Sequence, residues 1–272
     1  MAQSVLVLGG SGFIGERLVE LLRARGDTVS APPRSQLDIR DIAALRVYLA
    51  QHDTVVILTQ PDPQGIVALT SALALSQPKH IIYASTVLLY GTSPEPQGEN
   101  APLRPATSYE QAKFEEEAAL RALRGGHTLT IVRLGNVYGG LKNRGIVQKA
   151  LHAMYGGEPL AVAGEQQVRD FIHIDDVAAA IVHSIESLPG QVVNVTSAKG
   201  TTIDELLQTL ERVAGRGVPW VRPSGGRAGG AEAEHKDIIG DNAKLVASGF
   251  TPTILLQEGL AQTHQDYARS IR

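Results

Sequence analysis

Short apolar runs alternate with longer segments of helical spacing along the chain as far as residue 195. The runs are rich in β-branched residues and lack polar alternation, which is typical of strands buried on both faces of a sheet. These predicted strands lie at 5–8, 54–58, 80–84, 129–134 and 192–195. The segments in which apolar residues recur at helical spacing lie at 14–25, 42–50, 66–75 and 109–123.

Strands that alternate with helices pair in parallel through right-handed crossovers. The pattern therefore predicts an α/β fold with a Rossmann-type, doubly wound parallel sheet, which binds ligands at the carboxyl ends of its strands. After Gly139 the pattern loosens, and glycine and proline concentrate at 156–159 and in a predicted loop at 219–230. We expect this later part to form most of a smaller C-terminal lobe that covers the cleft.

Composition and charge narrow the choice of partners. The 272 residues include 25 basic and 28 acidic side chains without long blocks of one sign, which argues against nucleic acid or an anionic membrane and favours small molecules. The absence of cysteine excludes disulfides, thiolate metal sites and thiol nucleophiles. No apolar run approaches the roughly 20 residues of a membrane-spanning helix. The chain also starts without the basic segment of a secretory signal, so we expect a cytoplasmic protein.

A glycine-rich turn follows the first predicted strand and opens a predicted helix. Gly10, Gly12 and Gly15 fit G-x-G-x-x-G, and Gly9 in place of Gly10 fits equally well. Glycines allow the backbone to approach a pyrophosphate, whose charge the N–H groups and dipole of the helix start stabilise. A plain strand-to-helix turn is the alternative. The residues expected to contact a dinucleotide here are Gly9, Gly10, Gly12, Phe13, Ile14 and Gly15.

The position of this turn indicates which part of the chain binds the cofactor and which part binds the substrate. We expect residues 1–140, with 170–197 returning to them, to form a dinucleotide-binding domain. Residues 141–169 and 198–272 then form mainly the smaller lobe, which binds the substrate.

Residues 31–35, which follow the first predicted helix, bear on the choice of cofactor. About 20 residues beyond the last glycine, an NAD site usually carries an acid for the ribose hydroxyl. Residues 31–35 contain none. Arg34 and Ser35 instead suit a 2′-phosphate, so the sequence favours NADP slightly over NAD, unless Arg34 is a solvated loop residue.

Tyr109 and Lys113 lie four residues apart, on one face of a predicted helix. A nearby ammonium favours the phenolate and lowers the pKa of a tyrosine, which suits proton transfer. The chain holds a second such pair, Tyr138 and Lys142, but two glycines interrupt it. Residues 114–120, which follow Lys113, strongly favour a helix, so Tyr109 and Lys113 are the better candidates.

Thr86 follows the predicted strand at 80–84 after one further residue, Ser85. Its hydroxyl would therefore lie at the carboxyl end of a strand, where parallel sheets place their chemistry. It would hold a substrate oxygen beside the phenol of Tyr109, or it would simply cap the turn.

Together these features resemble the NAD-dependent epimerase/dehydratase family. Its members are extended short-chain dehydrogenases/reductases and include nucleotide-sugar 4-epimerases, 4,6-dehydratases and 4-ketoreductases. Residues 85–91 (STVLLYG) are similar to the segment whose Ser or Thr, four residues before Tyr-Gly, is catalytic, which selects Thr86. Residues 105–113 resemble the entry to the active-site helix. Residues 37–41 are similar to the adenine-reading segment and imply that Asp38 and Ile39 contact the cofactor.

Two segments of the second half are also close to family signatures, namely residues 133–139 and 168–177. By this resemblance, Asn136 and Arg169 contact the substrate diphosphate, and Arg227 joins them. Arginine suits this role because its fork gives two charge-assisted hydrogen bonds to a phosphate. The alternative for Arg169 is an ion pair with Asp170. His173, Asp175 and Asp176 have the residue types of metal ligands, yet Asp176 suits the start of a helix at 177–185, so we expect no metal site.

Three departures from the family pattern limit the resemblance. Leu58-Thr59-Gln60 lacks the usual small residues, so cofactor contacts there stay open. Only about twenty residues separate Gln60 from His80, which shortens a helix that often serves in a dimer interface and leaves a homodimer open. Val87 and Leu88 stand where 4,6-dehydratases carry an acid pair, which disfavours dehydratase activity.

The resemblance implies hydride transfer at a carbon of a nucleotide sugar, most simply C4. Tyr109 exchanges the hydroxyl proton, Lys113 lowers the pKa of Tyr109 and holds the nicotinamide ribose, and Thr86 orients the reacting oxygen. The activity is then that of a 4-epimerase or a 4-ketoreductase. The alternatives are a reductase of a non-nucleotide carbonyl compound and a non-catalytic NADP-binding sensor.

Overall fold

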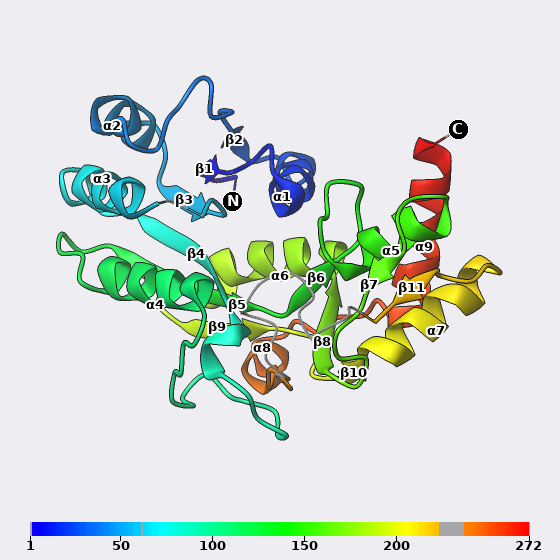
Figure 1. Cartoon of the computed structure of the whole chain (residues 1–272). Helices are drawn as coiled ribbons and strands as arrows, with labels where there is room; N and C mark the ends of the chain where they lie inside the picture. Colours follow the sequence, from blue (N-terminus) through cyan, green and yellow to red (C-terminus); the bar gives the residue numbers. More distant parts are fainter. Residues whose placement is uncertain (1, 61, 223–236, 272) are drawn as a thin grey trace.

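The computed structural model describes residues 2–60, 62–222 and 237–271, which are built around a six-stranded parallel sheet (Figure 1). The strand order is β2-β1-β3-β4-β5-β9. The order reverses direction at β1, because β2 lies on one side of it and β3 on the other; such a switch point opens a crevice at the carboxyl ends. The strands are β1 (Ser4–Leu8), β2 (Thr28–Ser30), β3 (Thr54–Ile57), β4 (His80–Thr86), β5 (Thr128–Leu134) and β9 (Val192–Val195).

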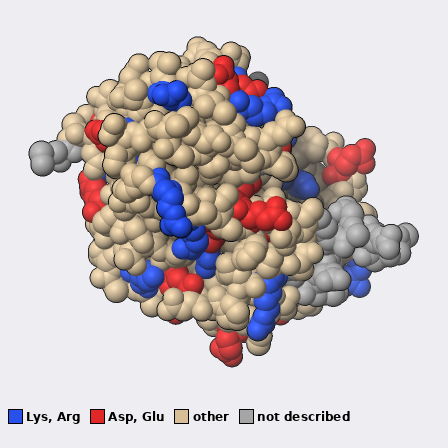
Figure 2. All heavy atoms as spheres, turned by 90° about the vertical axis from the view of Figure 1, so that its left-hand side faces the viewer, with Lys and Arg blue, Asp and Glu red and all other residues tan. Residues whose placement is uncertain are grey.

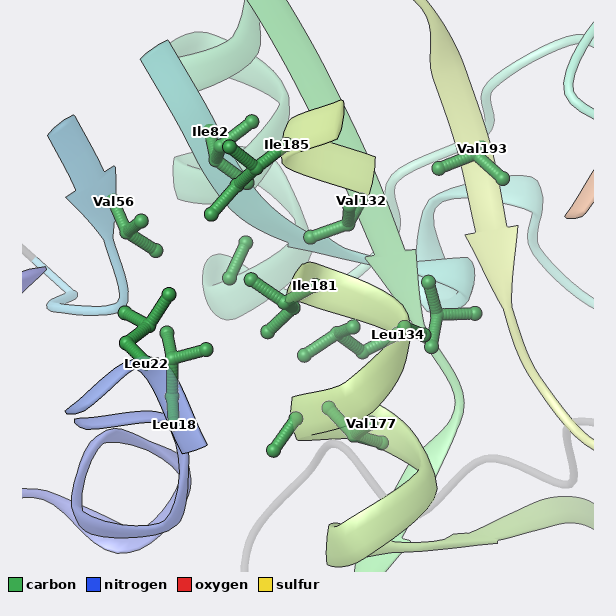
Figure 3. Close-up of a cluster of buried hydrophobic side chains, with 14 of the residues drawn as sticks. Leu18, Leu22, Val56, Ile82, Val132, Leu134, Val177, Ile181, Ile185 and Val193 are labelled. Atoms are coloured by element: carbon green, nitrogen blue, oxygen red, sulfur yellow. The ribbon is translucent and has the colours of Figure 1, made fainter. Parts of the chain in front are cut away.

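Helices cover both faces of this sheet (Figure 1). On one face, the helices α1 (Phe13–Ala24) and α6 (Ile174–Ser187) pack on alternate strand residues such as Val56 and Ile82 (Figure 3). The other face carries α2 (Ile42–Ala50), α3 (Pro63–Ala74) and α4 (Ser108–Arg121). Neighbouring strand residues point to opposite faces, and each face has its own apolar core.

The predicted strands and helices of this part are confirmed, and most differ from the prediction only at their ends. Strand β4 continues two residues further, to Thr86. Strand β2 was not predicted, because three residues are too short to show a pattern. Helix α6 begins at Ile174 rather than at Val177, and its N-cap is His173, whose ring nitrogen accepts a bond from the Asp175 N–H.

Two small sheets lie beside the six-stranded sheet in the described part of the chain. The three-stranded sheet has the order β10-β8-β6, with β10 (Gly200–Thr202), β8 (Val168–His173) and β6 (Asn136–Tyr138). The two-stranded sheet pairs β11 (Trp220–Val221) with β7 (Leu160–Ala161), so the predicted loop at 219–230 begins with a short strand. The remaining helices are η1 (Val87–Tyr90), α5 (Ile146–Met154), α7 (Ile203–Ala214), α8 (Ala243–Ala247) and α9 (Leu256–Ser270).

Figure 2 shows the side of the molecule on which α2, α3 and α4 lie in Figure 1. Basic and acidic side chains are interspersed there, with uncharged surface between them. Exposed apolar side chains on these three helices include Val47, Val67 and Phe114. In the described parts of the chain, no helix combines the length and the apolar character that crossing a membrane requires.

Candidate active site

The glycine-rich turn joins β1 to α1, and three of its glycines, Gly9, Gly10 and Gly15, have no room for a larger side chain. Gly9 has a φ of +91°, and its carbonyl oxygen accepts a hydrogen bond of 2.9 Å from the Gly12 N–H. A Cβ on Gly15 would lie 2.1 Å from that oxygen, and one on Gly10 would lie 2.5 Å from the Cβ of Ala31. Gly12 caps α1 without a side chain, so the helix start faces the crevice with backbone N–H groups alone.

Phe13 and Ile14 are the first two residues of α1. Ile14 packs against the apolar core between α1 and the sheet. Phe13 lies close to the chain after β6, since a Cβ on Gly140 would be 3.5 Å from its ring. Ile14 therefore ties the helix start to the sheet, whereas Phe13 lies next to the chain after β6.

A cavity of about 480 Å³ opens beside the glycine turn. Its lining includes Gly9, Gly12, Arg34, Asp38 and Ile39. Arg34 is exposed, and its side chain faces solvent at the rim of this cavity. The position of the cavity at the switch point of the sheet and the close-packed glycines fit a dinucleotide.

Asp38 is held by Arg40, a neighbour that no sequence pattern had pointed to. Arg40 donates to its carboxylate from the backbone N–H (2.9 Å), Nε (3.1 Å) and Nη2 (2.8 Å). This pairing keeps the pKa of Asp38 well below its ordinary value. In the same cavity, the Thr59 hydroxyl is buried and has no hydrogen-bond partner among the described residues.

Thr86 and Tyr109 meet at the carboxyl end of β4. Thr86 is the last residue of that strand, and its Oγ1 accepts a 3.2 Å bond from the Leu88 N–H, so it does cap the following turn. The same side chain is hydrogen-bonded to Tyr109. Tyr109 is the second residue of α4, which begins with a capping box of Thr107 and Glu110.

Lys113 lies one turn further along α4 and points into the protein. Its ammonium is 3.1 Å from each of three acceptors, namely the hydroxyl of Tyr83, the carbonyl of Ala84 and a carboxylate oxygen of Glu116. An ammonium has three donors, so all of them are used. Burial lowers the pKa of Lys113, and the carboxylates of Glu116 and Glu117 oppose that shift.

The electrostatics around Tyr109 differ from the expectation. Burial, followed by the charges of Glu116 and Glu110, raises the pKa of Tyr109, whereas the hydrogen bond with Thr86 lowers it. The predicted lowering by Lys113 is therefore wrong for this arrangement. The largest physical cause is burial of the phenol. The ammonium of Lys113 is also paired with the carboxylate of Glu116, which the sequence pattern did not indicate.

A second buried network lies beside this one and ties α4 to the sheet. Glu117 accepts bonds from the Ser85 hydroxyl (2.6 Å) and from Arg133 Nε (3.0 Å) and Nη2 (2.8 Å). Arg133 also donates to the Tyr90 hydroxyl, which donates in turn to Asn194 on β9. These residues link α4, β4, β5 and β9 and keep the site in place.

Two of the three predicted substrate residues lie on the three-stranded sheet. Asn136 begins β6, and Arg169 on β8 donates to the Val168 carbonyl (3.1 Å) and to Gln167 Oε1 (2.7 Å). Burial lowers the pKa of Arg169. Arg227 lies outside the described residues.

The alternative ion pair of Arg169 with Asp170 does not form. The carboxylate of Asp170 instead accepts bonds from Ser197 N (2.8 Å) and Oγ (2.7 Å), Ala198 N (3.1 Å) and Gly240 N (3.3 Å). Burial raises the pKa of Asp170 to about 6 in spite of these bonds. Asp170 therefore joins the loops after β9 and before α8.

Two further candidates from the sequence have structural partners. Asp176 does not cap α6; its carboxylate accepts the Thr253 and Ile254 N–H groups, at 3.1 and 2.9 Å. Tyr138 and Lys142 are not a pair, because the hydroxyl of Tyr138 donates to the Leu256 carbonyl and Lys142 binds Ser11 and Glu16.

Comparison with known proteins decides the family. The model of the NAD dependent epimerase/dehydratase family matches residues 5–196. The chain belongs to this family. It is 26% identical over 248 residues to the N-acetyl-alpha-D-glucosaminyl-diphospho-ditrans,octacis-undecaprenol 4-epimerase of Escherichia coli O157:H7, covering 80% of this chain and 75% of that protein.

Two other proteins are similar over most of their length. UDP-N-acetyl-alpha-D-glucosaminuronate decarboxylase of Bacillus cytotoxicus is 26% identical, over 78% of this chain and 81% of that one. The crystal structure of UDP-glucose 4-epimerase from Thermus thermophilus in complex with NAD superposes with a TM-score of 0.84 and 26% identity, over 97% of this chain and 99% of that one. The chain is therefore an enzyme of a nucleotide-sugar epimerase family with a Rossmann-type fold.

Proposed function

We propose that this chain is a cytoplasmic NAD(P)-dependent oxidoreductase of nucleotide sugars that works by hydride transfer at sugar C4, as a 4-epimerase or a 4-ketoreductase. The observation that carries this proposal is the hydrogen bond between Thr86 and Tyr109 at the carboxyl end of β4. Strand β4 is separated from the glycine turn after β1 only by β3. A phenol, a hydroxyl and a dinucleotide cavity thus share one edge of the sheet.

The division of labour among the residues follows from this arrangement. A bound nicotinamide cofactor would supply or accept the hydride. Tyr109 exchanges a proton with the sugar oxygen, and Thr86 orients that oxygen through its hydroxyl. Lys113 carries its charge beside them, held by Tyr83, Ala84 and Glu116.

Two observations bear on epimerase against ketoreductase. The three relatives named above include two 4-epimerases, which favours epimerisation. Arg34 instead offers an exposed cation at the dinucleotide cavity, and residues 31–35 contain no acid, which favours NADP and a reductase that releases its spent cofactor.

The diphosphate of the substrate is the second part of the proposal. Asn136 and Arg169 lie on adjacent strands of the small sheet, where a guanidinium would bind a phosphate. The relative from Escherichia coli acts on a sugar carried by undecaprenyl diphosphate, and this carrier shares the diphosphate with nucleotide sugars. A test of substrates must therefore contain both kinds of carrier.

The test is a panel of nucleotide sugars, their 4-keto derivatives and an undecaprenyl-diphosphate sugar, each assayed with NAD and with NADP, with products identified by NMR. Calorimetric titration of uridine, thymidine, guanosine and cytidine diphosphates into the cofactor-loaded protein reports carrier binding directly. Arg169→Ala should weaken it by about 1.5–3 kcal/mol, whereas Arg124→Ala, at an exposed loop position, should not. If no diphosphate binds at millimolar concentration, a reductase of a non-nucleotide carbonyl compound or an NADP-binding sensor replaces this proposal.

A further inference from the structure

Lys79 directly precedes β4 and so lies at the amino ends of the parallel strands, opposite the end that carries the glycine turn. It is buried, with 6% of the residue exposed. Its backbone N–H donates to His127 Nδ1, but its ammonium has no hydrogen bond or ion pair with any described residue. Burial of a charge without a partner is unfavourable, because the charge loses its hydration.

This state distinguishes Lys79 from the other buried charged residues in the described parts of the chain. Lys113 is paired with Glu116, and Arg133 is paired with Glu117. The remaining buried carboxylates accept hydrogen bonds from N–H groups and are those of Asp27, Glu110, Asp170 and Asp176. Lys79 is therefore a buried cation to which the described chain supplies no partner.

Two cavities adjoin Lys79. One, of about 490 Å³, lies at the starts of β1, β3, β4 and β5, and its lining includes Asp53. The carboxylate of Asp53 accepts a bond from Ser4 Oγ (3.0 Å) and would repel an anion. The other cavity, of about 530 Å³, lies between α2 and the segment that joins α3 to β4, and its lining contains Arg46 and Lys79 but no acid. The second cavity is therefore the one that suits an anion.

Much of the wall of this second cavity is apolar. Helix α2, which lies beside α3 (Figure 1), is apolar on two sides, since Leu45 and Leu49 are buried in the core while Val47 and Ala50 line the cavity. Val47 is 60% exposed, and Leu75, which lines the same cavity just after α3, is 63% exposed. A helix with apolar side chains on all sides is normally covered on all sides, so a ligand with an apolar body fits here.

The carbonyl ends of α2 and α3 oppose an anion to a limited extent. Ala50 is the last residue of α2, and Leu75 is the C-cap of α3. The negative end of a helix dipole favours a cation, which helps the fold to tolerate Lys79 when the cavity is empty. This effect is small beside direct contact of opposite charges, so we expect weak but specific binding of small anions.

We propose that the cavity lined by Arg46, Val47, Leu75 and Lys79 binds a small organic anion, whose charged group contacts the ammonium of Lys79 and whose aliphatic or aromatic body lies on Val47 and Leu75. The cavity volume of about 530 Å³ falls within the range of about 300–1,000 Å³ that ligand sites occupy. The site lies at the end of the sheet opposite the dinucleotide cavity, so its ligand and a cofactor bind at the same time. The inference does not rest on the proposed function.

The first experiment titrates hexanoate into the full chain labelled with ¹³C at the methyl groups of valine and leucine. The signals of Val47 and Leu75 are assigned by their loss in Val47→Ala and Leu75→Ala. Hexanoate should shift both signals saturably in the millimolar range, at constant ionic strength. The neutral 1-hexanol and inorganic phosphate should bind about 10-fold more weakly or less, because each has only one of the two features that the cavity recognises.

The outcomes of this titration are decisive in either direction. The absence of a saturable shift with hexanoate overturns the inference, and so does equal binding of 1-hexanol or of phosphate, because the charge or the apolar wall would then play no part. The affinity for hexanoate should be the same with and without saturating NADP⁺, and competition between the two would overturn the location. A chain that binds hexanoate here but neither NAD nor NADP would refute the proposed function and leave this inference in place.

Substitutions of Lys79 test the contact itself. Lys79→Gln should weaken hexanoate binding by about 10-fold or more, because the charged contact is lost, whereas Lys79→Arg should retain it. Lys149→Gln is the matched control, since it removes the same charge from an exposed position on α5 and should leave the affinity unchanged. Unchanged affinity in folded Lys79→Gln overturns the inference.

Thermal unfolding gives an independent measurement. Lys79→Met should raise the thermal midpoint of the unliganded chain, because it removes a buried charge that has no partner, whereas Lys149→Met should leave the midpoint unchanged. Hexanoate at about ten times its dissociation constant should raise the midpoint of the wild type by about 2–5 °C and that of Lys79→Met hardly at all. A lower midpoint in unliganded Lys79→Met, or the same rise with hexanoate in both proteins, overturns the inference.

Discussion

The two faces of the six-stranded sheet are covered in different ways. On the face of α1 and α6, the interface consists of apolar side chains such as Leu18, Leu22 and Ile181, each fully buried (Figure 3). On the opposite face, α4 brings charged side chains against β4 and β5. Those of its charged residues that are buried are Glu110, Lys113, Glu116 and Glu117.

The difference shows how stability and chemistry are divided within one sheet. Apolar contacts are non-directional and stabilise the fold in proportion to the area removed from water. Buried ion pairs contribute little net stability, because the loss of hydration offsets their attraction. Such pairs do fix a charge in one place, and α4 places them beside the hydroxyls of Thr86 and Tyr109. Substitutions on the two faces should therefore affect different properties.

The largest expected effect is on the charged face. Tyr109→Phe should lower kcat by about 10²- to 10⁴-fold, because it removes the hydroxyl that transfers the proton. This corresponds to a rise in the activation free energy of about 3–5.5 kcal/mol. Cofactor affinity should stay within a few fold, and the thermal midpoint should change little. Steady-state kinetics and cofactor titration measure both. Turnover like that of the wild type would remove Tyr109 from the mechanism.

The next effect belongs to the apolar face. Leu22→Ala should lower the free energy of unfolding by about 2–5 kcal/mol, since it leaves a cavity between α1 and the sheet. Urea denaturation measures the loss, and kcat should be unchanged where the variant is folded. Leu75→Ala is the control, because Leu75 is 63% exposed and its replacement should cost within about 0.5 kcal/mol. A large fall in kcat for folded Leu22→Ala would contradict the view that the apolar face serves stability and the charged face serves chemistry.

A smaller effect is expected at the cofactor cavity. Arg34→Ala should lower the ratio of NADP to NAD affinity by about 10-fold, near 1.5 kcal/mol, because a charge-assisted bond to a 2′-phosphate is lost and NAD has no such group. Arg46→Ala, on the exposed side of α2, removes the same charge away from this cavity. Fluorescence titration with both cofactors gives the ratio. Equal ratios in the two variants would show that Arg34 does not contact the cofactor.

The smallest effect compares two helix starts. Thr107 and Thr202 each form a capping box, at α4 and at α7. Replacement of either by alanine should cost about 1 kcal/mol of stability. Only Thr107→Ala should also reduce turnover, because α4 carries Tyr109 at its second position. Equal turnover in the two variants would mean that the start of α4 does not position the phenol.

Local sequence patterns were sufficient to predict five of the six strands of the main sheet, its helices and the glycine turn. An apolar run, a helical period or a glycine triplet is readable within one element, without knowledge of what packs against it. Thr86 at the end of β4 and the helix that carries Tyr109 and Lys113 followed from the same patterns. The start of α6 and the short strand β2 were less accessible, since caps and three-residue strands leave weak patterns.

Which charges meet depended instead on how the elements pack in space. Helix α4 carries four glutamates, and neighbouring ones have different surroundings, because Glu115 faces solvent while Glu116 faces Tyr83, which lies 33 residues earlier in the chain. The partners of Asp170 were likewise set by the loops that converge on it rather than by Arg169 beside it. The energy of a charge depends on its burial and on neighbours in space, and neither is fixed until the helix packs against the sheet.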